Sequence, residues 1–140
     1  SKFKCHTVHI KNSSQNIIKD LKSMGNFDVC FETTGIIKNI EIGYQIIDPI
    51  LGKLILIGVP KKNHLSKLYT LDMHFGKKII GSHGGDFNPD YDLNRYLKFI
   101  ENNYKYFISQ IDEVIELSNI NDGIQKIMKN KSIGKIIVKI

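Results

Sequence analysis

The sequence predicts an α/β protein in which helices flank a parallel sheet and a β-α-β appendage closes the chain. Short apolar runs alternate with segments whose apolar residues recur at helical spacing. The 11 glycines fall where these runs give way to helical patterns. The run 53–59 (KLILIGV) is apolar at nearly every position, which is typical of a strand covered on both faces by helices.

The N-terminal part predicts two strands, each followed by a helix. Residues 6–10 predict the first strand, and residues 12–14 supply N-cap candidates for a helix that ends at Gly25. Residues 27–33 (FDVCFET) predict the second strand. Gly35 leads into a second helix, which Pro49 stops because proline cannot continue the hydrogen-bond ladder. The apolar faces of the two helices consist of Ile17, Ile18, Leu21 and Met24, and of Ile36, Ile37, Ile40, Tyr44 and Ile47.

The rest of the chain predicts two more sheet strands and then the appendage. The strands cover residues 53–59 and 77–83, with a short helix and irregular chain over 65–75 between them. A helix follows over 90–103. The appendage consists of a strand at 113–117, a helix at 119–129 and a strand at 135–140. We therefore expect one domain over residues 1–86 and a second part over 87–140.

Composition excludes several classes of protein. With 140 residues, 41% of them hydrophobic, the chain can build a core, and its net charge of +6 is spread along the sequence. Two cysteines without a CxxC pair predict neither a disulfide framework nor a cysteine-rich zinc site, which favours a reducing, cytoplasmic setting. The longest apolar runs are far shorter than the roughly 20 residues that span a bilayer, so we expect a soluble protein.

The residue types that usually carry chemistry form no convincing cluster. His6 and His9 would face opposite sides of a strand, and His64 and His74 fall in polar connections, so no metal site is predicted. Cys30 lies inside a predicted strand, where a small buried thiol is favoured over a nucleophile. The acidic residues around the start of helix 90–103, Asp86, Asp90 and Asp92, are explained at least in part by capping.

Nucleic-acid binding is disfavoured as well. Residues 104–107 (YKYF) interleave lysine with aromatic rings, a pattern that can stack on bases. The same spacing suits a helix end packed on a core, and the positive charge alone is weak support.

Three strand ends remain as a candidate site: residues 33–35, 58–60 and 81–85. In open α/β sheets, ligands bind outside the carboxyl ends of the strands, where small residues let the backbone approach a cofactor. Each segment alone would be an ordinary turn. Their occurrence after consecutive strands leaves two interpretations open, a cofactor site and three ordinary turns.

At these residues the sequence resembles the C-terminal part of the zinc-dependent alcohol dehydrogenases in the medium-chain dehydrogenase/reductase family. The segments that carry the resemblance are 27–35 (FDVCFETTG), 52–60 (GKLILIGVP), 77–86 (KKIIGSHGGD) and 117–140. Together they extend nearly from end to end, and their order makes the resemblance fairly specific.

The resemblance implies a partial Rossmann-type domain that binds NAD or NADP over residues 1–86. The remaining residues would form a linking helix and a segment that returns to the catalytic domain. The implied cofactor contacts are Thr33, Thr34 and Gly35 in the cleft, Ile57, Gly58 and Val59 near the nicotinamide, and the backbone of Ser82 and His83 at its carboxamide. Gly134 falls where some relatives place an arginine on the pyrophosphate, so Lys135 is a substitute candidate.

The family's glycine-rich G-x-G-x-x-G turn and its zinc ligands have no counterpart in this sequence and would precede Ser1. No residue here is therefore predicted to be catalytic or to bind metal. The chain would supply strands 3 to 6 of the family's sheet, leaving a gap of about 14 Å between strands 3 and 4. We expect the missing N-terminal portion or a second copy to fill that gap; otherwise strand 3 repacks or frays. Members of the family commonly form dimers through the last strand of this sheet, here 77–83, so the resemblance implies a homodimer.

The sequence thus predicts the C-terminal fragment of an NAD(P)-dependent alcohol or polyol dehydrogenase. The fragment would contribute the nicotinamide side of the coenzyme cleft and subunit contacts, and would be inactive alone. The alternative is a non-catalytic oligomerisation or ligand-binding module with a remnant Rossmann sheet. The sequence leaves the substrate, and the choice between NAD and NADP, open.

Overall fold

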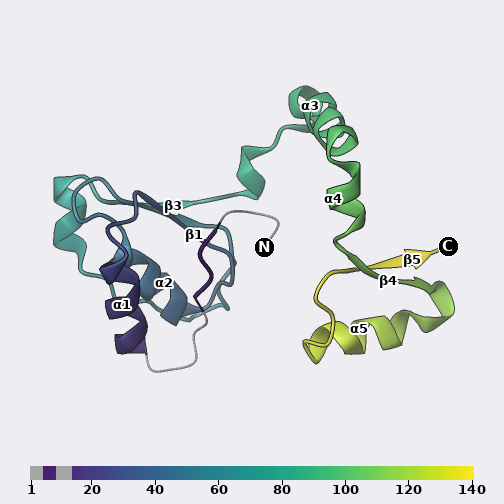
Figure 1. Ribbon diagram of the computed structural model, residues 1–140, viewed down its shortest axis with the longest axis horizontal. Helices are drawn as coiled ribbons and strands as arrows, with labels where there is room; N and C mark the ends of the chain where they lie inside the picture. The colour runs from purple at the N-terminus through teal and green to yellow at the C-terminus, as the bar shows by residue number, and fades with distance from the viewer. Residues whose placement is uncertain (1–4, 9–13) are drawn as a thin grey trace. The chain divides into compact units, whose positions relative to one another are not determined.

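The computed structural model describes residues 5–8 and 14–140, which form two compact units (Figure 1). The first unit runs to Phe87 and the second begins at Asn88.

The first unit contains a three-stranded parallel sheet. Its strands are β1 (Val29–Glu32), β2 (Lys53–Leu56) and β3 (Lys78–Gly81), in the order β1-β2-β3. The register aligns the last residues of all three strands, because Glu32 pairs with Leu56 and Leu56 pairs with Gly81. The predicted α/β class with a parallel sheet is confirmed. The aligned register also places the segments after the strands next to one another.

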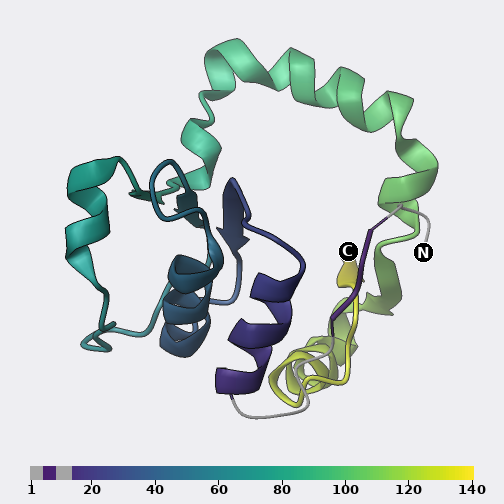
Figure 2. The ribbon, with the colours of Figure 1, turned by 60° about the vertical axis from the view of Figure 1, so that its left-hand side comes forward.

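Helices α1 (Ser14–Ser23) and α2 (Ile37–Ile46) lie side by side in both ribbon views (Figures 1 and 2). Helix α2 packs on the sheet through Ile40 and Tyr44, which form a core with Ile47 and Leu54. Its other buried residues, Ile42 and Ile46, pack against Ile17 of α1. The predicted apolar faces are therefore confirmed only in part: Ile17, Ile40, Tyr44 and Ile47 are buried as expected, whereas Met24 and Ile36 are exposed. The buried Ile42 and Ile46 lie on a second face of α2 that the predicted spacing did not include.

The expectation that residues 53–59 are covered on both faces is wrong for the described part of the chain. Leu54 is fully buried under α2, whereas Phe31 and Ile80, which flank Ile55 on the opposite face, are 64% and 40% exposed. The connection from β2 to β3 contains only a 3₁₀ helix, η1 (Thr70–Phe75), and its Met73 packs on the same core as α2. Because successive right-handed crossovers in one direction cover the same face, the other face stays open.

The predicted first strand is not found in the described residues. Residues 5–8 adopt no strand, and residues 9 and 10 lie outside the described part of the chain, as do the N-cap candidates 12 and 13. The sheet described here therefore has three strands instead of four. A strand needs a neighbour for its backbone groups, and no described segment pairs with β1 on its outer side.

The second unit begins with α3 (Pro89–Asn102) and a short helix, α4 (Tyr104–Ile108). Asn88 caps α3 by accepting a hydrogen bond from the Asp90 amide, and the Asp92 carboxylate accepts one from the Asn88 amide. The expectation that capping explains at least one of the acidic residues is therefore confirmed for Asp92. The single helix predicted over 90–103 ends at Asn103, whose backbone is not helical, and α4 follows as an element that the periodicity did not indicate.

The predicted β-α-β appendage is confirmed in the second unit. Strand β4 (Ile111–Glu116) leads through the short 3₁₀ helix η3 (Leu117–Asn119) into α5 (Ile120–Met128), and β5 (Lys135–Lys139) pairs parallel to β4. Half-buried residues alternate with exposed ones along both strands, so one side of each strand faces the packed interior. No helix among the described residues is long and apolar enough to cross a membrane.

Candidate functional site

The carboxyl edge of the three-stranded sheet brings together the predicted cofactor residues of the first unit. The amides of Ile57 and Gly58 both donate to the carbonyl oxygen of Glu32, at 2.8 and 2.9 Å. The Ser82 amide donates to the carbonyl of Leu56 at 2.9 Å. Segments 33–35, 57–59 and 82–83 therefore emerge next to one another, as expected for aligned parallel strands.

The first two of these segments pack backbone to backbone. A Cβ atom on Gly58 would overlap the backbone of Thr33, Thr34 and Gly35, and one on Gly35 would overlap the Val59 carbonyl group. Gly35 also has a φ of 66°, a left-handed conformation that favours glycine. The two glycines are therefore required by close approach, which the sequence could indicate only as small residues at strand ends.

Glu32 organises this edge and was not among the predicted site residues. One of its carboxylate oxygens accepts the Thr34 amide at 2.8 Å and the Thr34 hydroxyl, and the other accepts the Gly35 amide at 2.9 Å. The Thr34 hydroxyl in turn accepts hydrogen bonds from the Ile36 amide and the Asn39 side chain. The signal in the sequence is an acidic residue that ends an apolar strand directly before Thr-Thr-Gly.

The electrostatics of the edge follow from these contacts. Burial raises the pKa of the Glu32 carboxyl, but the hydrogen bonds from Thr34 and Gly35 outweigh it, so the net pKa is lower than usual. Burial raises the pKa of the Cys30 thiol, and the negative charge of Glu32 adds to that effect. Cys30 is therefore a packing residue rather than an activated thiolate, as its position in a strand predicted.

A hollow of about 400 Å³ opens beside the first two segments. Its lining includes Thr34, Gly35 and Val59 of the predicted residues, together with three basic side chains, Lys38, Lys61 and His64. Two apolar side chains of the edge face solvent, since Ile57 is 47% and Val59 is 88% exposed. An apolar wall beside lysine side chains fits a ligand that has an aromatic ring and phosphate groups.

Segment 82–83 does not share the close backbone packing of segments 33–35 and 57–59; it begins a turn. The Ser82 hydroxyl accepts a hydrogen bond from the Gly85 amide at 3.1 Å, and this bond holds the turn that follows β3. Ser82 is half-buried and His83 is exposed. Lys135, the remaining predicted cofactor residue, begins β5 in the second unit, where its amide donates to Gln110 and its side chain is exposed. Lys135 therefore belongs to a different unit from the other predicted cofactor residues.

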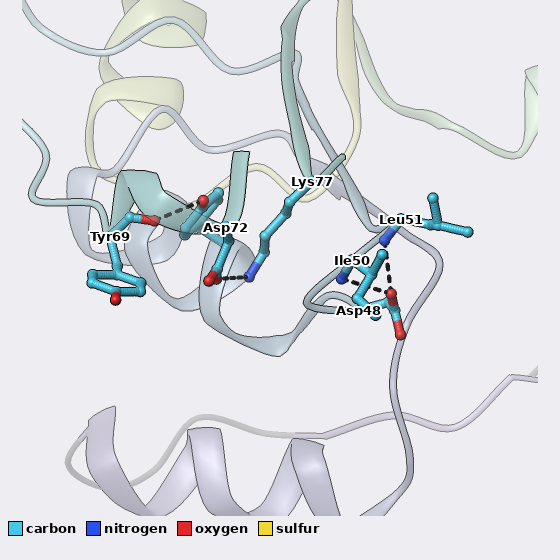
Figure 3. A network of polar contacts seen from close by, with 7 residues as sticks. Asp48, Ile50, Leu51, Tyr69, Asp72 and Lys77 are labelled. Atoms are coloured by element: carbon cyan, nitrogen blue, oxygen red, sulfur yellow. Dashed lines mark hydrogen bonds and ion pairs between the residues drawn. The ribbon is translucent and has the colours of Figure 1, made fainter. Parts of the chain in front are cut away.

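The opposite, amino edge of the sheet has a separate polar network (Figure 3). Lys77 is 4% exposed, pairs with Asp72 at 3.1 Å and lies 4.2 Å from the ring centre of Tyr44. The Asp48 carboxylate accepts hydrogen bonds from the amides of Ile50 and Leu51. These contacts tie the loops at that edge to the core.

Zinc does not fit the residues that the structure describes. Among residues 5–8 and 14–140, no group of three or more His, Cys, Asp or Glu side chains converges in a way that could hold a metal ion. The residues therefore support no chemical step through zinc in this part of the chain. A nicotinamide cofactor does fit the carboxyl edge, because the edge combines exposed apolar side chains with backbone segments held open by glycine.

Comparisons with known proteins agree with this geometry. The chain is 25% identical to alcohol dehydrogenase 1 from Trifolium repens over 123 residues, which is 88% of this chain and 32% of the relative. Benzyl alcohol dehydrogenase from Acinetobacter calcoaceticus superimposes with a TM-score of 0.77 at 22% identity, over 90% of this chain and 35% of that structure. In fold, this chain matches the C-terminal part of zinc-type alcohol dehydrogenases.

A third match carries a cofactor. It is a protein described as a zinc-binding dehydrogenase from Sinorhizobium meliloti, solved with bound NADP, with a TM-score of 0.62 at 18% identity over 81% of this chain and 31% of that structure. No protein-family model matches the sequence. The chain spans about a third of the length of these dehydrogenases, and the partial Rossmann-type fold expected from the sequence is confirmed.

Proposed function

We propose that this chain is the C-terminal part of an NAD(P)-dependent, zinc-type medium-chain alcohol or polyol dehydrogenase. Its carboxyl sheet edge forms the nicotinamide side of the coenzyme cleft. The observation that carries the proposal is the convergence of segments 33–35, 57–59 and 82–83 at one edge of a sheet that matches the fold of such enzymes.

The chain's own residues have a binding role in this proposal. Ile57 and Val59 provide an apolar surface for the nicotinamide ring, and the Ser82 and His83 backbone holds its carboxamide. Lys38 and Lys61 supply positive charge beside the hollow. Bound there, the nicotinamide would supply hydride chemistry to a substrate held by the rest of the enzyme. Lys135 remains a candidate for the pyrophosphate.

The proposal includes the partners and setting expected from the sequence. The coenzyme is NAD or NADP, and the Sinorhizobium relative with NADP supports this class of cofactor. We further propose that the open outer edge of β1 takes the missing N-terminal portion or a second copy. The edge of β3 joins two subunits in a homodimer. The setting is the cytoplasm, and neither a membrane nor a nucleic acid takes part.

The coding DNA upstream of Ser1 provides a direct test. We expect its translation in frame to encode a Cys/His zinc set and a G-x-G-x-x-G turn after a strand. A start codon directly before Ser1 would contradict the enzyme proposal. It would favour the alternative, a non-catalytic oligomerisation or ligand-binding module.

Cofactor binding can be tested on the chain itself. NADH and NADPH are titrated separately into the ¹⁵N-labelled chain, and the amide signals are followed by NMR. We expect the largest shifts in segments 33–35, 57–59 and 82–83, with smaller ones at Lys38 and Lys61 and a shift at Lys135 where it binds the pyrophosphate. Val59→Asp should weaken binding by about tenfold or more, because it replaces an apolar contact to the nicotinamide ring with a charged carboxylate.

The matched control is Leu51→Asp, which changes another exposed apolar residue at the amino edge of the sheet. It should leave the dissociation constant unchanged. Shifts spread over both edges, or equal losses in the two variants, would count against the proposed site.

A further inference from the structure

Glu32 connects the two segments that the proposed function places beside the nicotinamide. Its side chain accepts hydrogen bonds from Thr34 and Gly35, while its carbonyl oxygen accepts those of Ile57 and Gly58. One residue therefore provides acceptors for both neighbouring segments. Thr34, held by the carboxylate, also accepts the amide of Ile36 at the start of α2 at 3.1 Å.

The chemistry of these contacts requires a carboxylate at position 32. Glu32 is 4% exposed, and a buried carboxylate is costly unless hydrogen bonds replace its lost water. Both of its oxygens face N–H or O–H donors, so the group must accept at both ends. Glutamine would turn an NH₂ group toward one of these donors and leave a donor without an acceptor.

The packing of the two segments makes them depend on each other. Gly58 lies so close to the backbone of segment 33–35 that a Cβ atom would not fit, and Gly35 lies equally close to Val59. A displacement of the first segment therefore displaces the second. Hydrogen bonds from position 32 therefore reach both segments, although its side chain bonds to only one of them.

We propose that Glu32 is the positioning residue of this edge: its buried carboxylate holds segments 33–35 and 57–59 in one fixed arrangement that receives the nicotinamide. The role in cofactor binding rests on the proposed function above. The role in holding the two segments can be tested without any cofactor.

The test compares Glu32→Gln with Asp48→Asn in the full chain. Asp48 is a matched control because its carboxylate also accepts two backbone amides, those of Ile50 and Leu51, at the opposite edge of the sheet (Figure 3). Amide hydrogen exchange is measured by NMR in each variant, together with the melting temperature and the dissociation constant of NADH.

We expect Glu32→Gln to raise the exchange rates of Thr34, Gly35 and Gly58 by about tenfold or more, since each loses a charged acceptor or the packing that depends on it. NADH binding should weaken by a similar factor. Asp48→Asn should change neither these exchange rates nor the dissociation constant of NADH, even where it lowers the melting temperature as much as Glu32→Gln does. A purely structural role would instead make binding follow the melting temperature in both variants.

Two results would overturn the proposal: unchanged exchange at these amides in Glu32→Gln, or the same rise in Asp48→Asn. A third result distinguishes cofactor binding by this chain from the positioning role of Glu32. If the unsubstituted chain does not bind NADH but exchange rises as expected, then cofactor binding by this chain fails, while the positioning of the two segments by Glu32 stands.

Discussion

At the scale of single residues, Glu32 shows how a buried charge acquires a specific pH dependence. Its hydrogen bonds lower the carboxyl pKa below the value of an unfolded chain. The carboxylate therefore stabilises the fold fully above the usual glutamate pKa, and that stabilisation is lost as the pH falls through the folded pKa.

We predict that Glu32→Gln lowers the free energy of unfolding by about 1–3 kcal/mol at neutral pH. The deficit should shrink as the pH falls below the usual glutamate pKa and through the lower pKa of the folded chain, because protonation removes the same carboxylate from the unsubstituted chain. Urea unfolding at several pH values measures it. The control Glu101→Gln, on the exposed surface of α3, should have no such effect. A deficit that stays constant over this range would contradict the prediction.

At the scale of elements, the ends of neighbouring strands have different requirements for glycine. Gly58 follows β2 and lies against the backbone of segment 33–35, whereas Gly81 ends β3 and has open space where a Cβ would lie. The two glycines look alike in the sequence, because each directly follows a short apolar run. Only the packing of segment 33–35 on β2's end distinguishes them.

We predict that Gly58→Ala destabilises the chain by about 1–3 kcal/mol, because the backbone of segment 33–35 cannot yield as a flexible side chain would. Gly81→Ala should be close to neutral, since it meets no atom within 4 Å. Thermal or urea unfolding of the two variants gives the comparison. Equal losses of stability would show that the close packing at Gly58 has no energetic consequence.

At the scale of the whole molecule, the described residues leave much apolar surface exposed. Within residues 5–8 and 14–87, no helix packs on the open sheet face, which consists of Val29, Phe31, Ile55 and Ile80. In the same residues, β1 and β3 each have an outer edge that pairs with no other strand. Unpaired strand edges and exposed apolar faces favour association with another chain.

We predict that the 140-residue chain by itself self-associates with rising concentration in sedimentation velocity. Phe31→Ser should weaken association by about fivefold or more, because it removes a large ring from the open sheet face. Phe75→Ser is the matched control, since Phe75 is 65% and Phe31 is 64% exposed. A monomer that melts cooperatively at every concentration would contradict this expectation.

Local sequence patterns alone determined the kind and order of most elements. Helical spacing predicted α1, α2 and α5, and apolar runs predicted β1, β2 and β3, because each signal lies within one short segment. The strand ends at 33–35, 58–60 and 81–85 could be named as one candidate edge because parallel strands share a direction. The break at Asn103 and the helix α4 left no such local signal.

The tertiary structure decided which of these features act together. Glu32 joins two segments more than 20 positions apart, and Gly58 is essential only because segment 33–35 lies against it. The open sheet face and the unformed strand at residues 5–8 likewise depend on which neighbours are present. The local sequence pattern around a residue indicates its backbone conformation. Which residues it contacts across the sheet depends on the direction of the crossovers and on the strand register, which only the tertiary structure sets.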